Sequence, residues 1–295
     1  MNILEELHLG LYEKALPLNM TWHEKLTVTR EAGYSFLEMS IDATSERLLR
    51  LDWDVEAIKE IHKAIDNTGI PILSLALSAN RCYPLGDLDS NVRTMGIEIV
   101  RKAIDLAARV GIRIIQLSSY DVYDKPGNAK TQQNFMDSIL RCTEYAARKA
   151  VTLALETMDT AFVDTIIKAQ EIVRKIDSPY LQIYADVGNI VARGYDVLQE
   201  IYALDNHVVA IHLKDTQKGV FRRVPYGDGI VNFESIFKAL LNVNYQGLLV
   251  AEMWGDDLVS YLPYVGTANI FLRNTMKDER RMENCYENHG MSARH

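Results

Sequence analysis

The sequence has few cysteines and no long apolar run. Its three cysteines, Cys82, Cys142 and Cys285, are scattered along 295 residues, a number and spacing that fit neither a disulfide framework nor a cysteine-based metal site. No apolar run approaches the ~18 residues of a membrane helix, and Glu5 and Glu6 lie where a signal peptide would need apolar residues. These absences predict reduced thiols and a soluble protein of the cytoplasm.

Positive charge is also scarce. Lysine and arginine number 32 against 40 aspartates and glutamates, which gives a formal net charge of −8. Binding to nucleic acid or to an acidic membrane surface needs clustered positive charge, so neither partner is expected. The dinucleotide-binding motif G-x-G-x-x-G is missing as well, because the residues around the end of the first predicted strand read GLYEKALP (10–17).

The chain instead shows a regular alternation of two hydrophobic periods. Short apolar segments of strand length alternate with longer segments of helical period. The predicted strands are Leu7–Tyr12, Phe36–Ile41, Ile72–Leu77, Ile112–Ser118, Val151–Glu156, Leu181–Asp186, Val208–Leu213 and Gly247–Glu252. The predicted helices are Trp22–Ala32, Asp54–Asn67, Val92–Val110, Gln132–Lys149, Phe162–Ile176, Val197–Leu204, Phe233–Leu241 and about Asp257–Met276.

Eight strands that alternate with eight helices fit either a closed (β/α)₈ barrel or an open doubly wound sheet. The barrel is favoured because candidate ligand residues end several strands, and a barrel gathers strand ends around one mouth. One such barrel commonly occupies about 250 residues. We therefore predict a single (β/α)₈ TIM barrel over residues 1–276, followed by a polar, aperiodic tail over residues 277–295 that is frayed or contacts a partner.

Four successive strands in the second half each reach a residue of a metal-binding type. The segments are VTLALE, LQIYAD, VVAIH and LLVAE, which end at Glu156, Asp186, His212 and Glu252. One such glutamate alone would more often be a solvated loop carboxylate. Four charged groups at one narrow mouth are costly unless they are paired or bind a metal. Three carboxylates and an imidazole suit one divalent ion, with Mn²⁺ expected first and Mg²⁺, Co²⁺ or Zn²⁺ also compatible.

Longer motifs carry a resemblance to a known family. They are LGLYEKALP (9–17), FLEMSID (36–42), LSLALSANRCYPLG (73–86), MGIEIVRKAIDLAARVGIRIIQLSSYDVY (95–123), LALETMD (153–159), YADVGN (184–189), HLKDTQKGVFRRVPYGDGIVNF (212–233) and LLVAEMW (248–254). Together they resemble the xylose-isomerase-like barrel superfamily and, within it, the L-ribulose-5-phosphate or L-xylulose-5-phosphate 3-epimerases of L-ascorbate degradation and pentose phosphate catabolism. The resemblance spans residues 7–273, and one departure is Asn80, where the family would have a histidine.

The resemblance implies an activity and roles for particular residues. It implies an isomerase that interconverts L-xylulose 5-phosphate and L-ribulose 5-phosphate, with one divalent metal and no redox cofactor. Glu156, Asp186, His212 and Glu252 would be the metal ligands, and the two glutamates would be the acid–base pair. Epimerisation at C3 of a 2-ketose needs a proton removed on one face and returned on the other, which two carboxylates can do by turns. The metal would stabilise the cis-enediolate electrostatically.

Substrate contacts are less sharply predicted. Candidates are Tyr12, Lys14, Ser78, Asn80, Ser118, Asp159, Asn189, Lys218, Arg222 and Trp254, with Arg81 as a further phosphate ligand. Each could equally be a loop cap or a packing residue. Glu13 and Glu38 could orient substrate or satisfy buried polar groups, and the structural role is favoured for Glu38. The expected partner is a small ketose phosphate, and a homo-oligomer, first of all a dimer, is expected.

Several other functions stay open at this point. The same metal chemistry would serve a 3-epimerase of free ketoses, or an aldose–ketose isomerase of the hexulose-6-phosphate type that acts between C1 and C2. Apurinic-site endonucleases share the barrel but need several zinc ions and more strand-end histidines than His212 alone. A barrel that binds without catalysis would be expected to have lost Glu156 or Glu252, and both are present.

Overall fold

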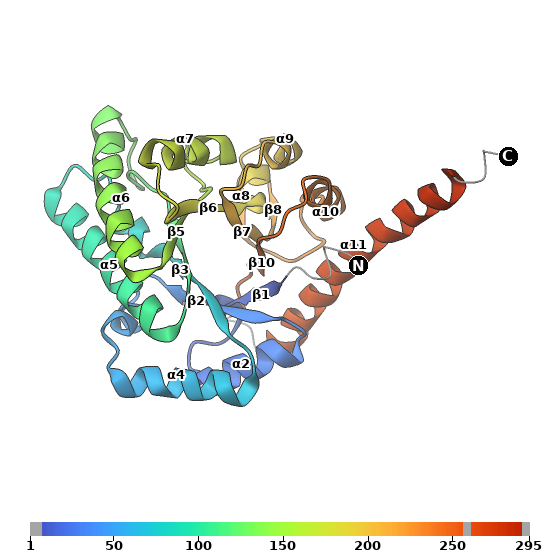
Figure 1. Ribbon diagram of the computed structural model, residues 1–295, viewed down its shortest axis with the longest axis horizontal. Helices are drawn as coiled ribbons and strands as arrows, with labels where there is room; N and C mark the ends of the chain where they lie inside the picture. The colour runs from blue at the N-terminus through green and yellow to red at the C-terminus, as the bar shows by residue number, and fades with distance from the viewer. Residues whose placement is uncertain (1–7, 256–260, 291–295) are drawn as a thin grey trace.

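The computed structural model describes residues 8–255 and 261–290, and among these the side chains of residues 8–255 and 262–277. Eight parallel strands form a closed barrel with the neighbour order β1-β10-β7-β6-β5-β4-β3-β2 (Figure 1). They are β1 (Leu9–Tyr12), β2 (Phe36–Ile41), β3 (Ile72–Leu77), β4 (Ile114–Ser118), β5 (Thr152–Glu156), β6 (Leu181–Asp186), β7 (Val208–Leu213) and β10 (Leu248–Ala251). The predicted (β/α)₈ barrel is confirmed, and each predicted strand overlaps one of these.

Helices surround the barrel (Figure 1). They are α2 (Trp22–Glu31), α3 (Ser45–Leu48), α4 (Val55–Thr68), α5 (Ser90–Val110), α6 (Ala129–Lys149), α7 (Ile166–Ile176), α8 (Val187–Ala192), α9 (Val197–Tyr202), α10 (Phe233–Asn242) and α11 (Tyr261–Gly290). Three 3₁₀ turns are η1 (Glu13–Ala15), η2 (Leu49–Asp52) and η3 (Ser78–Arg81). No helix in the described part of the chain is both long and apolar enough to span a membrane.

Local sequence signals set the helix ends. Thr21 begins α2 with a capping box, in which its side chain accepts the Glu24 N–H while the Glu24 carboxylate accepts the Thr21 N–H. Asp54 caps α4 through the N–H of Ala57. The same helix ends at Gly69, whose φ of +70° lies in the left-handed region that favours glycine. These contacts fix where the chain turns back toward the barrel.

The interior of the barrel is packed with side chains. Its apolar cluster consists of Tyr12, Phe36, Ala76, Ala154, Tyr184, Ala210 and Val250. The alanines leave room for the three aromatic rings, and a Cβ at Gly10 would lie 2.3 Å from the Phe36 ring. Successive strand residues face opposite sides, so a residue two positions after an inward one also faces inward. Glu156, Asp186, His212 and Glu252 each follow a member of this cluster by two positions, which places all four inside the barrel mouth.

A hairpin after β7 was not predicted. Its strands β8 (Asp215–Gln217) and β9 (Val220–Val224) pair antiparallel, with Gly219 at φ +73° in the turn. The Asp215 carboxylate accepts backbone N–H groups from Gly227, Gly229 and Val231, and so ties down the loop that follows the hairpin. Strands of three and five residues with mixed polarity give no clear period in the sequence, which is why the hairpin escaped the sequence analysis.

The last helix is longer than predicted. Helix α11 runs to Gly290, whereas the apolar period predicted an end at Met276, and its C-terminal part extends away from the barrel (Figure 1). Residues 277–290 lack an apolar stripe but are rich in good helix formers such as Lys, Glu, Arg and Met, so helical propensity continues where periodicity stops. The predicted start points Leu7 and Asp257, and the tail after Gly290, lie outside the described residues. The division into a barrel and a separate tail stays a prediction.

Glu13 lies in a buried ion-pair cluster beside the barrel. Its carboxylate accepts hydrogen bonds from Lys25 Nζ at 2.5 Å, from the Arg50 guanidinium at 2.6 and 2.8 Å, and from the Ser40 N–H at 2.8 Å. Burial raises the pKa of Glu13, but the positive charges of Arg50 and Lys25 outweigh burial and lower the pKa to about 2. The groups around this carboxylate therefore belong to a stabilising ion-pair cluster. Glu13 does not line the pocket described below.

Replacing Glu13 with Gln is expected to destabilise the protein by about 3–5 kcal/mol at pH 7, because two buried cations lose their counter-charge. The folded pKa lies below the ordinary value of 4.5, so the carboxylate's contribution is complete above that pH and is lost as the pH falls toward 2. Urea unfolding of both proteins from pH 7 to pH 3 measures this. The difference between them should shrink with falling pH, and a difference that stays constant would contradict the assignment.

Candidate active site

Four side chains of metal-binding types converge at the carboxyl ends of the barrel strands. Glu156 and Asp186 end β5 and β6, His212 lies in β7, and Glu252 directly follows β10. All four are buried, and one potential ligand atom from each lies within 4.8 Å of the others. The strand ladder contributes to this convergence, because Asp186 is in register with His212 across β6 and β7. The cluster could hold one metal ion.

His212 presents its two ring nitrogens to different partners. Nδ1 faces the cluster, at 3.0 Å from Glu156 Oε1 and 3.8 Å from Glu252 Oε2. Nε2 faces away from it, at 2.7 Å from Glu38 Oε1. The ring also lies against Tyr184, with centroids 4.5 Å apart. The ring orientation is thus fixed from three sides, and Nδ1 is the nitrogen available to a cation.

Two further polar residues complete the cluster, and neither was predicted. Lys214 is buried, with Nζ 2.6 Å from Asp186 Oδ2 and 2.9 Å from Glu252 Oε2. Its stem packs on Gly188 at the start of α8, where an added Cβ would lie 2.5 Å from Lys214 Cγ. Gln116 in β4 donates from Nε2 to Glu156 Oε2. The one available signal for Lys214 was its position two residues after His212, which places both side chains on the same face.

Charge and burial shift the pKa values within the cluster. Burial raises the pKa of Glu252, but the positive charges of Lys214 and His212 outweigh burial and lower it to about 2. Burial is the strongest influence on Asp186 and raises its pKa, against the attraction of Lys214. Burial lowers the pKa of His212, whereas the negative charges of Glu38 and Glu252 raise it by more. Neighbouring charges and burial, rather than solvent, therefore set ionisation here.

The donor set fits a divalent cation. Asp186 Oδ2 and Glu252 Oε2 are buried and accept no hydrogen bond of ordinary geometry from the described residues, although both lie near the Lys214 ammonium. Buried oxygens of this kind are normally satisfied by a donor or a cation. Three carboxylates and one imidazole nitrogen make an oxygen-rich set of the type that Mn²⁺, Mg²⁺, Co²⁺ and Zn²⁺ accept.

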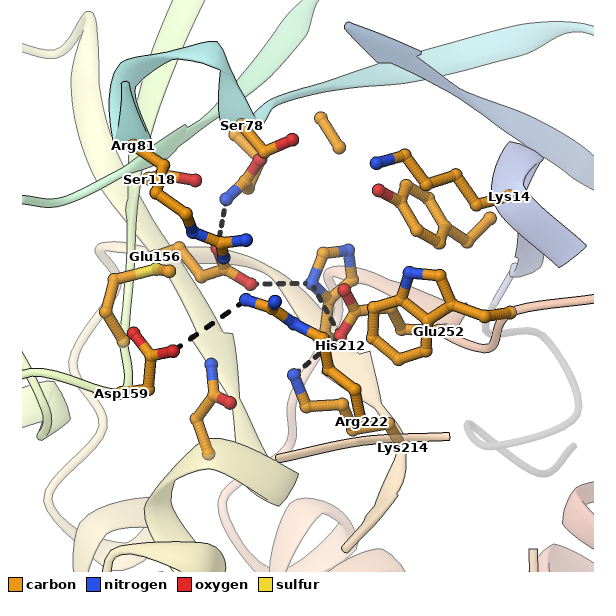
Figure 2. A pocket seen from close by; sticks show the side chains of 16 residues that line it. Lys14, Ser78, Arg81, Ser118, Glu156, Asp159, His212, Lys214, Arg222 and Glu252 are labelled. Atoms are coloured by element: carbon orange, nitrogen blue, oxygen red, sulfur yellow. Dashed lines mark hydrogen bonds and ion pairs between the residues drawn. The ribbon is translucent and has the colours of Figure 1, made fainter. Parts of the chain in front are cut away.

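A pocket opens above the cluster, and Figure 2 shows the side chains that line it. It encloses about 530 Å³, part of which is open to solvent. Of the residues predicted to contact substrate, nine line this pocket: Tyr12, Lys14, Ser78, Arg81, Ser118, Asp159, Asn189, Arg222 and Trp254. Gln116 and Lys214, which were not predicted, line it as well. Side chains from distant parts of the sequence therefore share one cavity.

Two predicted contact residues lie elsewhere. Asn80 is buried in the turn η3, and its Nδ2 donates to the Tyr83 carbonyl at 3.2 Å, so this amide stabilises the turn. Lys218 is exposed at the tip of the β8–β9 hairpin, whose turn directs it to solvent rather than to the cavity. Neither side chain lines the pocket. We leave both out of the proposed site.

The pocket also gathers cationic side chains, although the chain carries a net charge of −8. Lys14, Arg81 and Arg222 reach it from η1, η3 and β9 (Figure 2). Arg222 lies 3.7 Å from Asp159, and the Arg81 guanidinium stacks over the Tyr120 and Tyr123 rings. Ser118 Oγ and Arg81 Nε are buried in the same region without a hydrogen-bond partner among the described residues. This region can therefore accept an anionic group.

Comparisons with known proteins agree with the barrel fold. The family described as xylose isomerase-like TIM barrel matches residues 26–275. L-ribulose-5-phosphate 3-epimerase from Salmonella heidelberg (strain SL476) is 44% identical over 272 residues, which cover 92% of this chain and 96% of that protein. The enzyme of the same name from Escherichia coli (strain ATCC 8739) is 44% identical over 252 residues, 85% of this chain and 89% of that one.

Solved structures share the fold at lower identity. The structure of an L-ribulose 3-epimerase superposes with a TM-score of 0.79 and 17% identity, over 98% of this chain and 99% of that one. The apo structure of 3-keto-D-glucoside 4-epimerase from E. coli gives a TM-score of 0.75 and 20% identity, over 91% of this chain and 100% of that one. At this identity the likeness establishes the barrel fold.

Proposed function

The chain belongs to the family of xylose isomerase-like TIM barrels, and from this premise we propose that it is an isomerase that interconverts L-xylulose 5-phosphate and L-ribulose 5-phosphate by epimerisation at C3. Its 44% identity to L-ribulose-5-phosphate 3-epimerases, over 92% of the chain, supports this substrate pair. The observation that carries the proposal is the placement of Glu156 and Glu252 on two sides of one buried donor cluster. Acid–base chemistry on both faces of one carbon needs such a pair.

The two glutamates would share the proton transfers. β5 and β10 are separated by β6 and β7 in the barrel, so Glu156 and Glu252 approach the pocket from different directions. One carboxylate takes the C3 proton, which is acidified by the adjacent C2 carbonyl, and the other delivers a proton to the opposite face of the enediolate. The exchange is symmetrical in outcome, because each residue is the base for one epimer and the acid for the other.

Neighbouring side chains orient each carboxylate for proton transfer. Glu156 is held by Gln116 and His212, and Glu252 lies beside the Lys214 ammonium. A divalent cation held by Glu156, Asp186, His212 and Glu252, which we propose to be Mn²⁺, would supply positive charge close to the enediolate oxygens. Trp254 and Tyr12 pack edge to face on the pocket wall, with ring centroids 6.1 Å apart, and limit the access of water.

The cationic side chains of the pocket would bind the 5-phosphate. Lys14, Arg81 and Arg222 line the pocket on three different segments, so a phosphate held there would be anchored at a distance from the reacting carbon. Binding energy from such a remote group positions the substrate for reaction at C3. Asp159 and Asn189, which also line the pocket, are proposed to contact substrate hydroxyl groups.

Deuterium exchange tests the proposal. The purified protein with Mn²⁺ is incubated in D₂O with L-xylulose 5-phosphate, L-ribulose 5-phosphate, free L-xylulose and a ketohexose 6-phosphate, and NMR locates the label. We expect interconversion of the two pentulose phosphates with deuterium at C3, and a kcat/KM for free L-xylulose lower by roughly 100-fold or more. Label at C1 would indicate an aldose–ketose isomerase instead, and equal turnover of the free sugar would indicate a free-ketose epimerase.

The partner, the oligomeric state and the location of the protein are predicted from the sequence. The proposed partner is a small ketose phosphate, and the net charge of −8 supports the absence of a nucleic-acid partner. A homodimer and a cytoplasmic location remain expectations from the sequence.

A further inference from the structure

Glu38 lies in β2 beneath the donor cluster and is completely buried. Its Oε1 is 2.7 Å from His212 Nε2. Its Oε2 accepts hydrogen bonds from the Tyr184 hydroxyl at 2.5 Å and from Ser74 Oγ at 2.7 Å. Glu38 does not line the pocket, so it does not touch a substrate bound there. Its influence on the chemistry must pass through His212.

This contact determines which nitrogen of His212 can bind a cation. A carboxylate can only accept hydrogen bonds, and both hydroxyl donors are directed at Oε2. Oε1 is thereby left to accept a hydrogen from Nε2 of His212. A neutral imidazole with its hydrogen on Nε2 has a lone pair on Nδ1. Nδ1 is the nitrogen that faces Glu156 and Glu252.

We propose that Glu38 is a positioning residue of the cation site, which holds His212 in the Nε2–H tautomer and aims Nδ1 at the other three ligands. The inference rests on the proposed role of His212 as a ligand. It replaces the structural role that the sequence favoured for Glu38. The chain of contacts runs through four strands, from Ser74 in β3 and Tyr184 in β6 to Glu38 in β2 and His212 in β7. Loss of a residue that hydrogen-bonds directly to a metal-ligating histidine commonly lowers metal affinity by about 10–100-fold.

The substitution Glu38→Gln separates hydrogen-bond polarity from packing, because the two side chains have nearly the same shape. With its oxygen directed at the hydroxyls of Tyr184 and Ser74, the amide would place its NH₂ group against His212 Nε2. Nε2 would then have to accept, and the hydrogen would move to Nδ1, where it blocks the cation. The opposite amide orientation would require both hydroxyl groups to reverse. That second arrangement would keep Nδ1 bare, but it loses both hydrogen bonds that the hydroxyl groups now donate to Oε2, so the first arrangement is expected to dominate.

Cation affinity and the position of the hydrogen are the readouts. Mn²⁺ binding is measured by EPR, with thermal unfolding to verify the fold, and the ¹⁵N-histidine spectrum is recorded on protein loaded with diamagnetic Zn²⁺. We expect the wild-type protein to carry its hydrogen on Nε2, and Glu38→Gln to bind Mn²⁺ about 10–100-fold more weakly. The matched control is Tyr184→Phe, which removes one donor to Oε2 but retains the ring and the Glu38–His212 contact. Its Mn²⁺ affinity should stay within about threefold of the wild type.

Two results would overturn the inference. One is a Glu38→Gln protein that binds Mn²⁺ as tightly as the wild type. The other is a wild-type spectrum with the hydrogen on Nδ1, which decides the matter even if the variant does not fold. A protein that binds Mn²⁺ with the hydrogen on Nε2, loses affinity on Glu38→Gln and yet epimerises no pentulose phosphate would support the role of Glu38 while the proposed reaction fails.

Discussion

Replacing His212 with alanine is expected to lower Mn²⁺ affinity by roughly 100-fold or more and to abolish epimerisation, while the barrel stays folded. His212 supplies the nitrogen donor of the cluster and is held between Glu156 and Glu38. Its loss removes the nitrogen ligand from the set of four and leaves the cation to three carboxylates, which weakens the site. Residues at the carboxyl ends of barrel strands serve function more than stability, so the unfolding temperature should change little by comparison.

His207 provides a matched control on the same segment. It directly precedes β7, at the opposite end of that strand from the site, and its Nδ1 is 3.0 Å from Gln182 Oε1. His207→Ala should retain both metal and activity. Metal content after dialysis, activity and thermal unfolding are measured for both variants, and for wild-type protein before and after chelation. Chelation should abolish activity and Mn²⁺ should restore it. A fully metal-loaded His212→Ala protein would show that the cation is held elsewhere.

The sequence was sufficient for the barrel and for the four-residue cluster because the signals for both are local. Each strand has its own apolar run, and Glu156, Asp186, His212 and Glu252 each stand at or next to the end of one. A closed barrel then brings such positions together whatever the details of the loops. The predicted convergence required no knowledge of side-chain contacts. The metal-binding role itself remains a proposal.

Residues that depend on packing between distant segments could not be predicted in the same way. Lys214 belongs to HLKD, where a lysine after a strand suggests a solvated loop. Its burial depends on Gly188 from the β6–α8 junction. Glu38 is unremarkable within FLEMSI until β6 and β7 bring Tyr184 and His212 against it. Asn80 does not line the pocket for the converse reason, since its amide donates a hydrogen bond to the nearby Tyr83 carbonyl. Which groups these side chains contact is decided only when the folded chain brings distant segments together.

The reaction mechanism makes a further prediction, which concerns the division of labour between Glu156 and Glu252. Glutamine at either position retains the size and one oxygen donor but cannot act as a base. With one face disabled, each variant should lose epimerisation by about 10²–10⁴-fold. Each should still exchange the C3 proton of one epimer with solvent, because the remaining carboxylate can remove and return a proton on its own face. The two variants should therefore label opposite epimers in D₂O.

The local contacts suggest that the two faces will not be equivalent. Glu252 lies 2.9 Å from the Lys214 ammonium, whereas Glu156 is held by the neutral Gln116 amide and by His212. A neighbouring cation stabilises the ionised form of a carboxylate and lowers its pKa, which makes the carboxylate a weaker base. The Glu156→Gln protein, which retains Glu252 beside Lys214, should accordingly exchange its preferred epimer more slowly than Glu252→Gln exchanges the other.

Deuterium wash-in is measured for each pure epimer with each variant, together with metal content, so that loss of the cation is not mistaken for loss of a base. If both variants keep their metal and epimerise at near wild-type rates, the two-base mechanism is wrong. Glu13 could not then take over, because Lys25 and Arg50 enclose its carboxylate away from the pocket. Asp159, which lines the pocket 3.7 Å from Arg222, would be the carboxylate to examine next. Retained exchange in Asp159→Asn would exclude it in turn.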